Sequence, residues 1–251
     1  MRSFMVFLKK EVLEQFRTKR FLVLLCVFAA LGVTSPILAR YMQEIINMAA
    51  GNIALQMPEP TWIDSWGQFY SNLTQLGALV VIVLHMGSIS EEKKSGSAAL
   101  TLTKNLSHGK FVSAKFLSAS VFTTASFLLA IIINYSYTHY IFGEAGNVGR
   151  VISSSASYLV ALIALIAVIT LASALTKSSL ASAMISFAGY ISFTILQNIP
   201  VVRYISPGLL MGQAVGLLGG QAFSAVPVFG TLCLVAVCVV GAVMSLKKQE
   251  I

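Results

Sequence analysis

The chain has 251 residues, of which 57% are hydrophobic and only 10% are charged, and its formal net charge is +8. Soluble domains typically carry about 25% charged and about 45–50% apolar residues. This composition excludes an ordinary water-soluble protein and predicts an all-α integral membrane protein.

Residues 1–20 predict an amphipathic helix that lies in the membrane interface. Its apolar positions recur at the spacing of one helix face, while Arg17 falls on the polar side. Such a helix buries its apolar stripe among acyl chains and keeps its basic side near anionic headgroups. No small-residue cleavage site ends the apolar run that follows, so we interpret the segment as part of the mature chain. The residues of the apolar stripe are Phe4, Leu8, Val12 and Phe16.

Six later segments are long and apolar enough to cross a bilayer, which takes about 20 residues each. Pro36 removes a backbone hydrogen bond near the end of the first span and predicts a kink there. A charged segment at 90–115 separates the second and third spans, and a short tail at 247–251 follows the last one. The predicted spans of this six-helix domain, 21–246, are 21–39, 67–89, 116–140, 151–175, 180–199 and 226–246.

The positions of Lys and Arg predict the orientation of the chain. All of these residues except Arg40, Arg150 and Arg203 fall in the segments at the two chain ends, in 90–115 and between the fourth and fifth spans. Lys and Arg accumulate on the cytoplasmic side of membrane proteins. We therefore expect both termini and residues 90–115 inside, and the basic charge requires no nucleic-acid partner.

The segment before the last span predicts a short helix on the outer side. Ser206 is a favourable helix cap and Pro207 a favourable first residue. Four glycines then recur every four positions, which predicts a flat stripe that packs closely against the spans. We expect a re-entrant or surface helix; a flexible glycine-rich loop is the alternative, because glycine weakens helices. The stripe consists of Gly208, Gly212, Gly216 and Gly220.

The sequence contains neither the phosphate-binding motif of P-loop ATPases nor the common hydrolase and zinc-protease motifs. The predicted spans also carry no carboxylate of the kind that ion-driven carriers use. The membrane domain therefore lacks a visible energy source. A charged cytoplasmic segment between two spans favours a partner that supplies energy from the cytoplasm.

The 90–115 segment has a recognisable order of residue types. An acidic pair, a Gly-Ser step and a leucine-containing stretch precede Lys115 at the start of the third span. Together with the topology, this order resembles the permease subunits of ABC exporters of the ABC type-2 family. Asn105 and His108 depart from the Pro and Arg that are common there. The residues that carry the resemblance are Glu91, Glu92, Gly96, Leu100 and Leu102.

The resemblance implies that these five residues belong to a coupling helix, which docks on a separate ATP-hydrolysing subunit. That partner would bind ATP and Mg, so we expect no cofactor, no metal and no enzymatic activity in this chain by itself. Acidic residues at the start of such a helix are favourable for its dipole. We also hypothesise that Glu91 or Glu92 pairs with a basic residue of the interfacial helix, such as Arg17 or Lys19, and so ties the two cytoplasmic elements together.

The resemblance further implies a dimer of identical or paralogous permeases in the cytoplasmic membrane of a bacterium, with spans one, two and five along the transport path. A largely apolar path suits a hydrophobic or amphipathic peptide, toxin or antimicrobial. Two other classes remain open: an ATP-independent channel or carrier, and a non-transporting scaffold or immunity protein. The candidate path residues are Gln68, Asn72, Gln75, Phe187 and Phe193.

Overall fold

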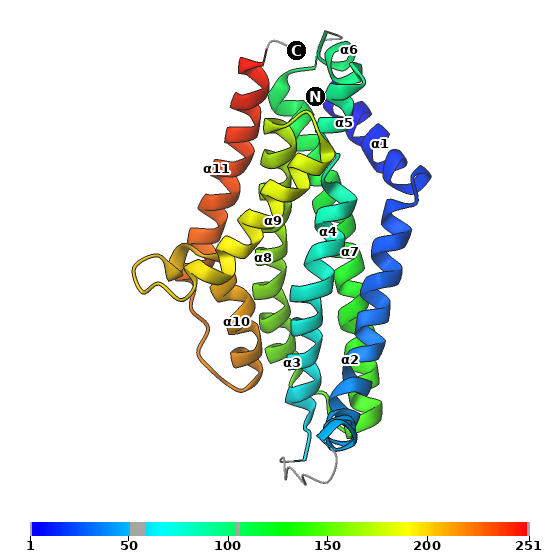
Figure 1. The fold of residues 1–251 in the computed structure, drawn as a ribbon, viewed down its shortest axis with the longest axis vertical. Coiled ribbons are helices and arrows are strands. Elements are labelled where there is room, and N and C mark those ends of the chain that lie inside the picture. Colours follow the sequence, from blue (N-terminus) through cyan, green and yellow to red (C-terminus); the bar gives the residue numbers. More distant parts are fainter. Residues whose placement is uncertain (1, 51–58, 104–105, 250–251) are drawn as a thin grey trace.

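The computed structural model describes residues 2–50, 59–103 and 106–249, and no strand occurs among them. Figure 1 shows an elongated bundle of helices that run mainly along one axis. The predicted all-α class is confirmed for this part of the chain. Asn105 and the last two residues of the predicted tail lie outside the described residues.

The elements follow one another in a simple order along the chain. The helices are α1 (Arg2–Arg17), α2 (Arg20–Ala50), α3 (Trp62–Asn72), the π-helical turn η1 (Leu73–Gly77), α4 (Ala78–His85), α5 (Ser90–Lys94), α6 (Ser97–Thr103), α7 (His108–Phe142), α8 (Val148–Leu175), α9 (Ser179–Leu196), the 3-10 turn η2 (Arg203–Ile205), α10 (Pro207–Leu218) and α11 (Val226–Lys248).

Six stretches in the described part of the chain are long and apolar enough to cross a membrane, and each one overlaps a predicted span. The second is not a uniform helix, because η1 interrupts it between α3 and α4. The six stretches are Arg20–Met42, Trp62–Lys94, His108–Phe142, Val148–Leu175, Ser179–Leu196 and Val226–Lys248.

Local capping determines where several helices begin. Ser107 accepts a hydrogen bond from the backbone N–H of Lys110 at the start of α7. Asn147 caps α8 in the same way, and Ser206 caps α10 with Pro207 at its first turn. The cap predicted at Ser206 is therefore confirmed. These side chains satisfy backbone donors that have no partner within the helix.

Helix α8 forms the centre of the bundle, and α7, α9, α10 and α11 pack around it. Trp66, Phe127 and Tyr158 are fully buried in the main core cluster. The helices α9 and α11 expose most of their apolar side chains at the periphery. Such a distribution suits spans that face lipid, where packing rather than hydrophobicity holds helices together.

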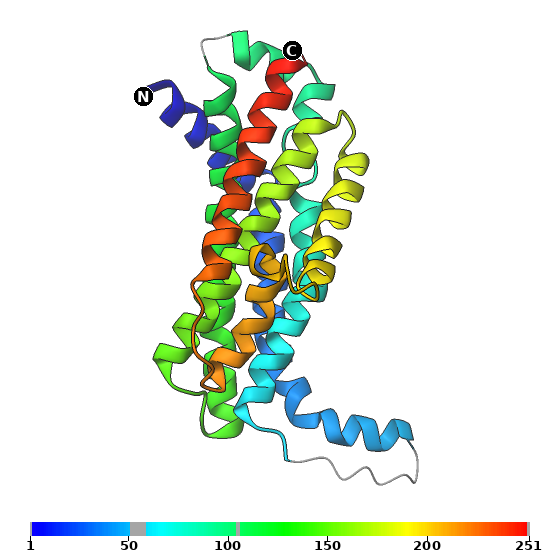
Figure 2. The ribbon, with the colours of Figure 1, turned by 90° about the vertical axis from the view of Figure 1, so that its left-hand side faces the viewer.

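One end of the bundle gathers several segments that are distant in sequence. Figure 1 places the start of α1, the helices α5 and α6 and the end of α11 at this end. Figure 2 shows that the last part of α2 turns sharply away from the bundle at the other end. Pro36 lies inside α2 shortly before this turn, where a kink is expected.

Helix α10 packs against α8, α3 and α9, and Gly208 is the one member of the predicted glycine stripe that belongs to its buried face. A side chain at Gly208 would overlap the carbonyl of Phe193, whereas Gly212 is exposed and Gly220 lies beyond the end of the helix with φ +91°. Gly216 sits beside the side chain of Gln221. The expected close packing therefore holds at Gly208 but is wrong for the other three glycines, because larger residues between them carry most of the packing. The buried residues of α10 are Pro207, Gly208, Leu210, Met211, Ala214, Leu217 and Leu218.

Candidate functional site

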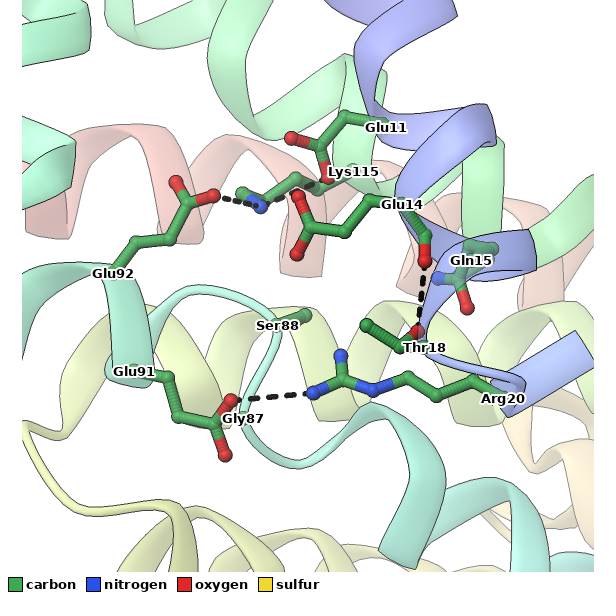
Figure 3. A pocket seen from close by; sticks show the side chains of 11 residues that line it. Glu11, Glu14, Gln15, Thr18, Arg20, Gly87, Ser88, Glu91, Glu92 and Lys115 are labelled. Carbon is green, nitrogen blue, oxygen red and sulfur yellow. Dashed lines mark hydrogen bonds and ion pairs between the residues drawn. The ribbon is translucent and has the colours of Figure 1, made fainter.

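A cluster of charged side chains lies between α1, α5 and α7. Figure 3 shows Glu92 and the α1 carboxylates converging on one lysine. Sequence positions more than 100 residues apart meet here, because α1 packs against the long helix α7. The charged cluster consists of Lys10, Glu11, Glu14, Glu92 and Lys115.

Lys115 lies at the centre of the charged cluster. Its Nζ is 2.9 Å from Oε2 of Glu11 and 3.1 Å from Oε1 of Glu92. The side chains of Lys115 and Glu11 are only 3% and 7% exposed. A buried ion pair is strongly destabilised when one partner is removed, because the other charge is left without compensation. The cluster therefore holds α1, α5 and α7 together in one arrangement.

Lys10 bridges the same carboxylates from the edge of the cluster. Its Nζ lies 2.9 Å from Oε1 of Glu92 and 3.1 Å from carboxylate oxygens of Glu11 and Glu14. Partial burial lowers the pKa of Lys10, but the neighbouring carboxylates outweigh that effect and raise its pKa above the ordinary value of 10.5. Lys10 therefore stays charged at physiological pH.

Aromatic rings support both lysines. The ammonium of Lys10 lies 5.3 Å from the ring centre of Phe7, and that of Lys115 lies 5.3 Å from the ring centre of Phe111. The two rings are themselves 5.4 Å apart. Cation–π contact and ring packing thus complement the ion pairs between α1 and α7.

A second ion pair joins α5 to the first span. Arg20 donates to Oε2 of Glu91 at 3.2 Å, and about half of the Glu91 side chain is exposed. A side chain at Gly87 would overlap the carboxylate of Glu91, so glycine leaves room for it. This exposed pair is expected to contribute less to stability than the buried cluster.

The opposite side of α5 is bonded to α8 and to the end of α11. The backbone N–H groups of Ile89 and Ser90 each donate to Oγ of Ser173 at 2.9 Å. Lys93 donates to the backbone carbonyl of Ala174 at 2.6 Å and to Oε1 of Gln249 at 3.0 Å. Helix α5 is therefore fixed to α1, α2, α7, α8 and the residue that ends α11.

The chain turns between α5 and α6 at Gly96, which has φ +74°. This left-handed conformation favours glycine, because a Cβ would be strained there. After the turn, Ala98 is buried and Leu102 is partly buried in the core cluster at this end, whereas Leu100 is 67% exposed. Helix α6 therefore packs against the bundle through Ala98 and Leu102 and exposes Leu100.

The expected pairing of the acidic pair with basic residues of segment 1–20 is confirmed, but the two residues named as examples, Arg17 and Lys19, are not the partners. Glu92 pairs with Lys10 and Lys115, and Glu91 pairs with Arg20. Arg17 and Lys19 are both exposed instead, and Lys19 has φ +58° in the turn between α1 and α2.

Helix α1 also presents different faces from those predicted. Phe4, Leu8 and the buried Phe7 pack against the core cluster at this end, with Glu11 on the same side. Val12 is partly exposed, and Phe16 is 54% exposed beside the rings of Phe21 and Phe122. The predicted stripe is therefore split between the bundle and the periphery. The other exposed apolar residues of α1 are Met5, Val6 and Leu13.

The carboxylates of the cluster could be read as a cation site, since oxygens of Glu11, Glu14 and Glu92 lie within 4.8 Å of one another. Lys10 and Lys115 already approach these oxygens at ion-pair distance. The positive charges of the site are therefore supplied by lysine. This geometry favours a structural connection between helices over metal binding.

The candidate path residues are only partly brought together. Gln68 donates to Asn72 at 3.1 Å, and Asn72 donates to Ser35 of α2 at 2.9 Å. Gln75 is exposed one turn further along. In α9, Phe193 is buried and Phe187 is exposed on another side of the helix. The candidate path residues therefore do not share one surface. The polar residues Gln68, Asn72 and Gln75 lie along the second span, and Phe187 lies apart from them on α9.

The helices define the class of this protein: it is an all-helical, multi-pass transmembrane protein. The chain belongs to the family described as "Protein of unknown function (DUF2705)", which matches residues 54–251. The match includes α5, α7 and α8, whereas α1 and α2 precede it.

A relative with a similar sequence is the "Uncharacterized transmembrane protein YxlG" of Bacillus subtilis (strain 168), which is 28% identical over 149 residues. The similarity covers 58% of this chain and 57% of the relative, so it spans less than two thirds of either protein. It supports the transmembrane class of the chain.

Proposed function

We propose that this chain is the permease subunit of an ATP-driven exporter similar to the ABC type-2 family. In this proposal, α5 and α6 dock on a separate ATP-hydrolysing subunit, and the spans form the transport path. The observation that carries the proposal is the set of bonds that fixes α5 to α1, α2, α7, α8 and the end of α11.

A docking segment transmits force only if it is rigidly connected to the parts that must move. Helix α5 contains five residues and would not be stable alone, because isolated short helices are marginal in water. The ion pairs of Glu92 and the hydrogen bonds to Ser173 hold it against the spans. A displacement of α5 by a partner would therefore reach both sides of the bundle.

The charge distribution supports a cytoplasmic position for this docking segment. The end of the bundle that holds α5 and α6 also holds the start of α1 and the end of α11 (Figure 1), where Lys and Arg are concentrated. The positive-inside rule then assigns this end to the cytoplasm and α1 to the inner interface of a bacterial cell membrane.

The transport path requires a second permease, identical or paralogous, in this proposal. Its cargo is a hydrophobic or amphipathic peptide, because α3 and η1 carry no charged side chain after Asp64 in the first turn of α3. The two alternatives make different predictions. A self-sufficient channel transports without ATP, and a scaffold or immunity protein binds its ligand without ATP-dependent flux.

The proposal is tested by co-purification. The tagged chain is extracted from its native membrane in mild detergent after chemical crosslinking, and ATP hydrolysis is measured on the purified complex. The proposal predicts vanadate-sensitive hydrolysis by a separate subunit. It is overturned if the crosslinked complex contains no ATPase, and transport by the purified chain without ATP would favour the channel.

A further inference from the structure

Two irregularities in the bundle face each other about half-way along its long axis. One is η1, the π-helical turn within the second span. The other is the break between α9 and α10, where residues 197–206 leave the bundle sideways (Figures 1 and 2). Interrupted helices inside transporters commonly surround binding sites, and π-turns also concentrate at functional sites.

The π-turn is fixed by tyrosines from neighbouring helices. Tyr190 of α9 donates a hydrogen bond to the backbone carbonyl of Thr74, and the hydroxyl of Tyr158 in α8 lies 3.0 Å from Oγ1 of Thr74. Both partners come from other helices, so the distortion is held by tertiary contacts. Such support is expected where a departure from α-helical geometry serves a purpose.

The break after α9 is also held in place by defined contacts. Ser206 donates to the carbonyl of Phe193 at 2.8 Å, and a side chain at Gly208 would overlap that carbonyl. The close approach brings the start of α10 against the end of α9. It also places the side chain of Gln197 beside Gly212, where glycine leaves space.

A pocket of about 270 Å³ lies between these two irregularities, and we call it the mid-bundle pocket. No acidic or basic side chain is among the described residues that line it. The polar lining consists mainly of amides and hydroxyls, and the remainder is apolar. The residues that define its chemistry are Ser71, Gln75, Thr194, Gln197, Met211 and Val215.

This lining selects a class of ligand. A charged group would enter without a counter-ion, which is costly away from water. Nε2 of Gln75 already donates to Oγ of Ser71 at 3.0 Å, but a purely apolar group would offer no partner to the remaining hydrogen-bonding capacity of Gln75 and Gln197. A primary amide both donates and accepts hydrogen bonds, so Gln75 and Gln197 complement another amide. The size of the pocket, near the lower limit of about 300 Å³ for small-molecule sites, suits a short segment of chain.

We infer that the mid-bundle pocket binds the backbone amides of an uncharged stretch of a hydrophobic peptide. The inference rests on the proposed export function, because it names where such a cargo is recognised. Gln75 and Gln197 hydrogen-bond the peptide backbone, while Met211 and Val215 contact its apolar side chains. Binding at this site requires no ATP.

The test uses the purified full chain in lipid nanodiscs without nucleotide. The probe is a tritiated leucine–alanine tetrapeptide with an acetyl and an amide cap. Saturable binding is expected, and the analogue with N-methylated backbone should bind at least tenfold more weakly, because it has lost its N–H donors. Equal binding of both peptides would overturn the inference, since it would show apolar partitioning only.

Variants locate the binding. Gln75→Leu and Gln197→Leu should each weaken peptide binding about tenfold, and Gly212→Leu should abolish it by filling the pocket. Gln213→Leu is the matched control, because Gln213 lies in α10 but does not line the pocket. Each variant is first checked for normal elution and thermal unfolding. Undiminished binding in all folded pocket variants would contradict the inference.

The binding assay and the ATPase co-purification can fail independently. If the peptide binds through Gln75 and Gln197 but no ATPase accompanies the chain, the mid-bundle pocket stands and the exporter proposal falls. If an ATPase accompanies the chain and the peptide does not bind, the exporter proposal stands and the pocket inference falls.

Discussion

Lys115 and Glu11 are 104 positions apart in the sequence, yet Nζ of the lysine lies 2.9 Å from Oε2 of the glutamate. Both side chains are almost completely buried. The pair connects α7 to α1, and Glu92 extends the connection to α5 at 3.1 Å from the same nitrogen. This arrangement makes the charged cluster the connection between α5, α1 and the third span.

Replacing the central lysine should therefore destabilise the protein strongly. Lys115→Met leaves Glu11 and Glu92 with less compensating charge, which costs about 3–5 kcal/mol for a buried pair. The measurement is thermal or denaturant unfolding in detergent micelles. Lys110→Met is the control, because Lys110 is exposed on the same helix and should change stability by no more than about 0.5 kcal/mol. Equal losses of stability in Lys115→Met and Lys110→Met would show that the charged cluster does not hold these helices together.

The two glutamates of α5 should differ in their importance. Glu92 is 13% exposed and contacts Lys10 and Lys115, whereas Glu91 is 52% exposed and contacts Arg20. An exposed pair contributes about 0–1 kcal/mol. Glu92→Gln should thus lower the unfolding temperature more than Glu91→Gln, and it should also reduce ATP hydrolysis by the complex. A larger drop in unfolding temperature for Glu91→Gln than for Glu92→Gln would contradict this prediction.

Glycine at the turn between α5 and α6 should be needed for its backbone conformation. Gly96 has φ +74° with open space around it, so Gly96→Ala costs about 1–2 kcal/mol through strain alone. Gly109 also has open space but lies in α7, where alanine favours the helix by up to about 1 kcal/mol. Unfolding in denaturant should therefore show opposite signs for the two alanine variants, and matching signs would disprove the turn geometry.

The junction of α9 and α10 offers a second comparison between glycines. Gly208→Ala would place a methyl group against the carbonyl of Phe193 and should push the two helices apart. At Gly212 the nearest neighbour is 3.8 Å away, so Gly212→Ala should be tolerated. Disulfide trapping between cysteines placed in α9 and α10, in a chain without its native cysteines, reports the separation. Unaltered trapping in Gly208→Ala would refute the close approach.

The dependence of stability on pH should reflect the raised pKa of Lys10. Because this pKa lies above 10.5, the stabilising effect of the ammonium is complete below pH 10.5 and is lost only as the pH rises through the raised pKa. The difference in unfolding temperature between the wild type and Lys10→Met should therefore stay constant from about pH 7 to about pH 10. A difference that shrinks within this interval would show that the carboxylates do not raise the pKa of Lys10.

Hydropathy and charge were sufficient to predict the six spans, and local capping chemistry predicted the start of α10 at Ser206. The charged cluster was not predictable, because Glu11 reads as a solvated residue of an amphipathic helix until its partner on α7 is known. Lys115, a charge at the start of an apolar span, was the available signal. The π-turn at Leu73–Gly77 was also missed, since tertiary hydrogen bonds from tyrosines hold it and no local sequence pattern does.

The faces of α1 and α10 were mispredicted for a related reason. Periodicity identifies residues that share a side of a helix, but it does not say which side meets the bundle. In α1 the buried side includes Phe7 and Glu11, and in α10 it includes Leu210 and Ala214 between the glycines. Contacts with other helices decided both orientations.

We propose that an ATP-hydrolysing partner docks on α5 and α6, and site-specific photo-crosslinking in native membranes tests this docking. A benzophenone side chain is introduced at Ser95, which is exposed between these helices, and at Tyr140 near the opposite end of α7 as the control. The account predicts that position 95 captures a nucleotide-hydrolysing subunit and that position 140 does not. Capture of that subunit at position 140, or of none at position 95 in an intact membrane, would contradict the account.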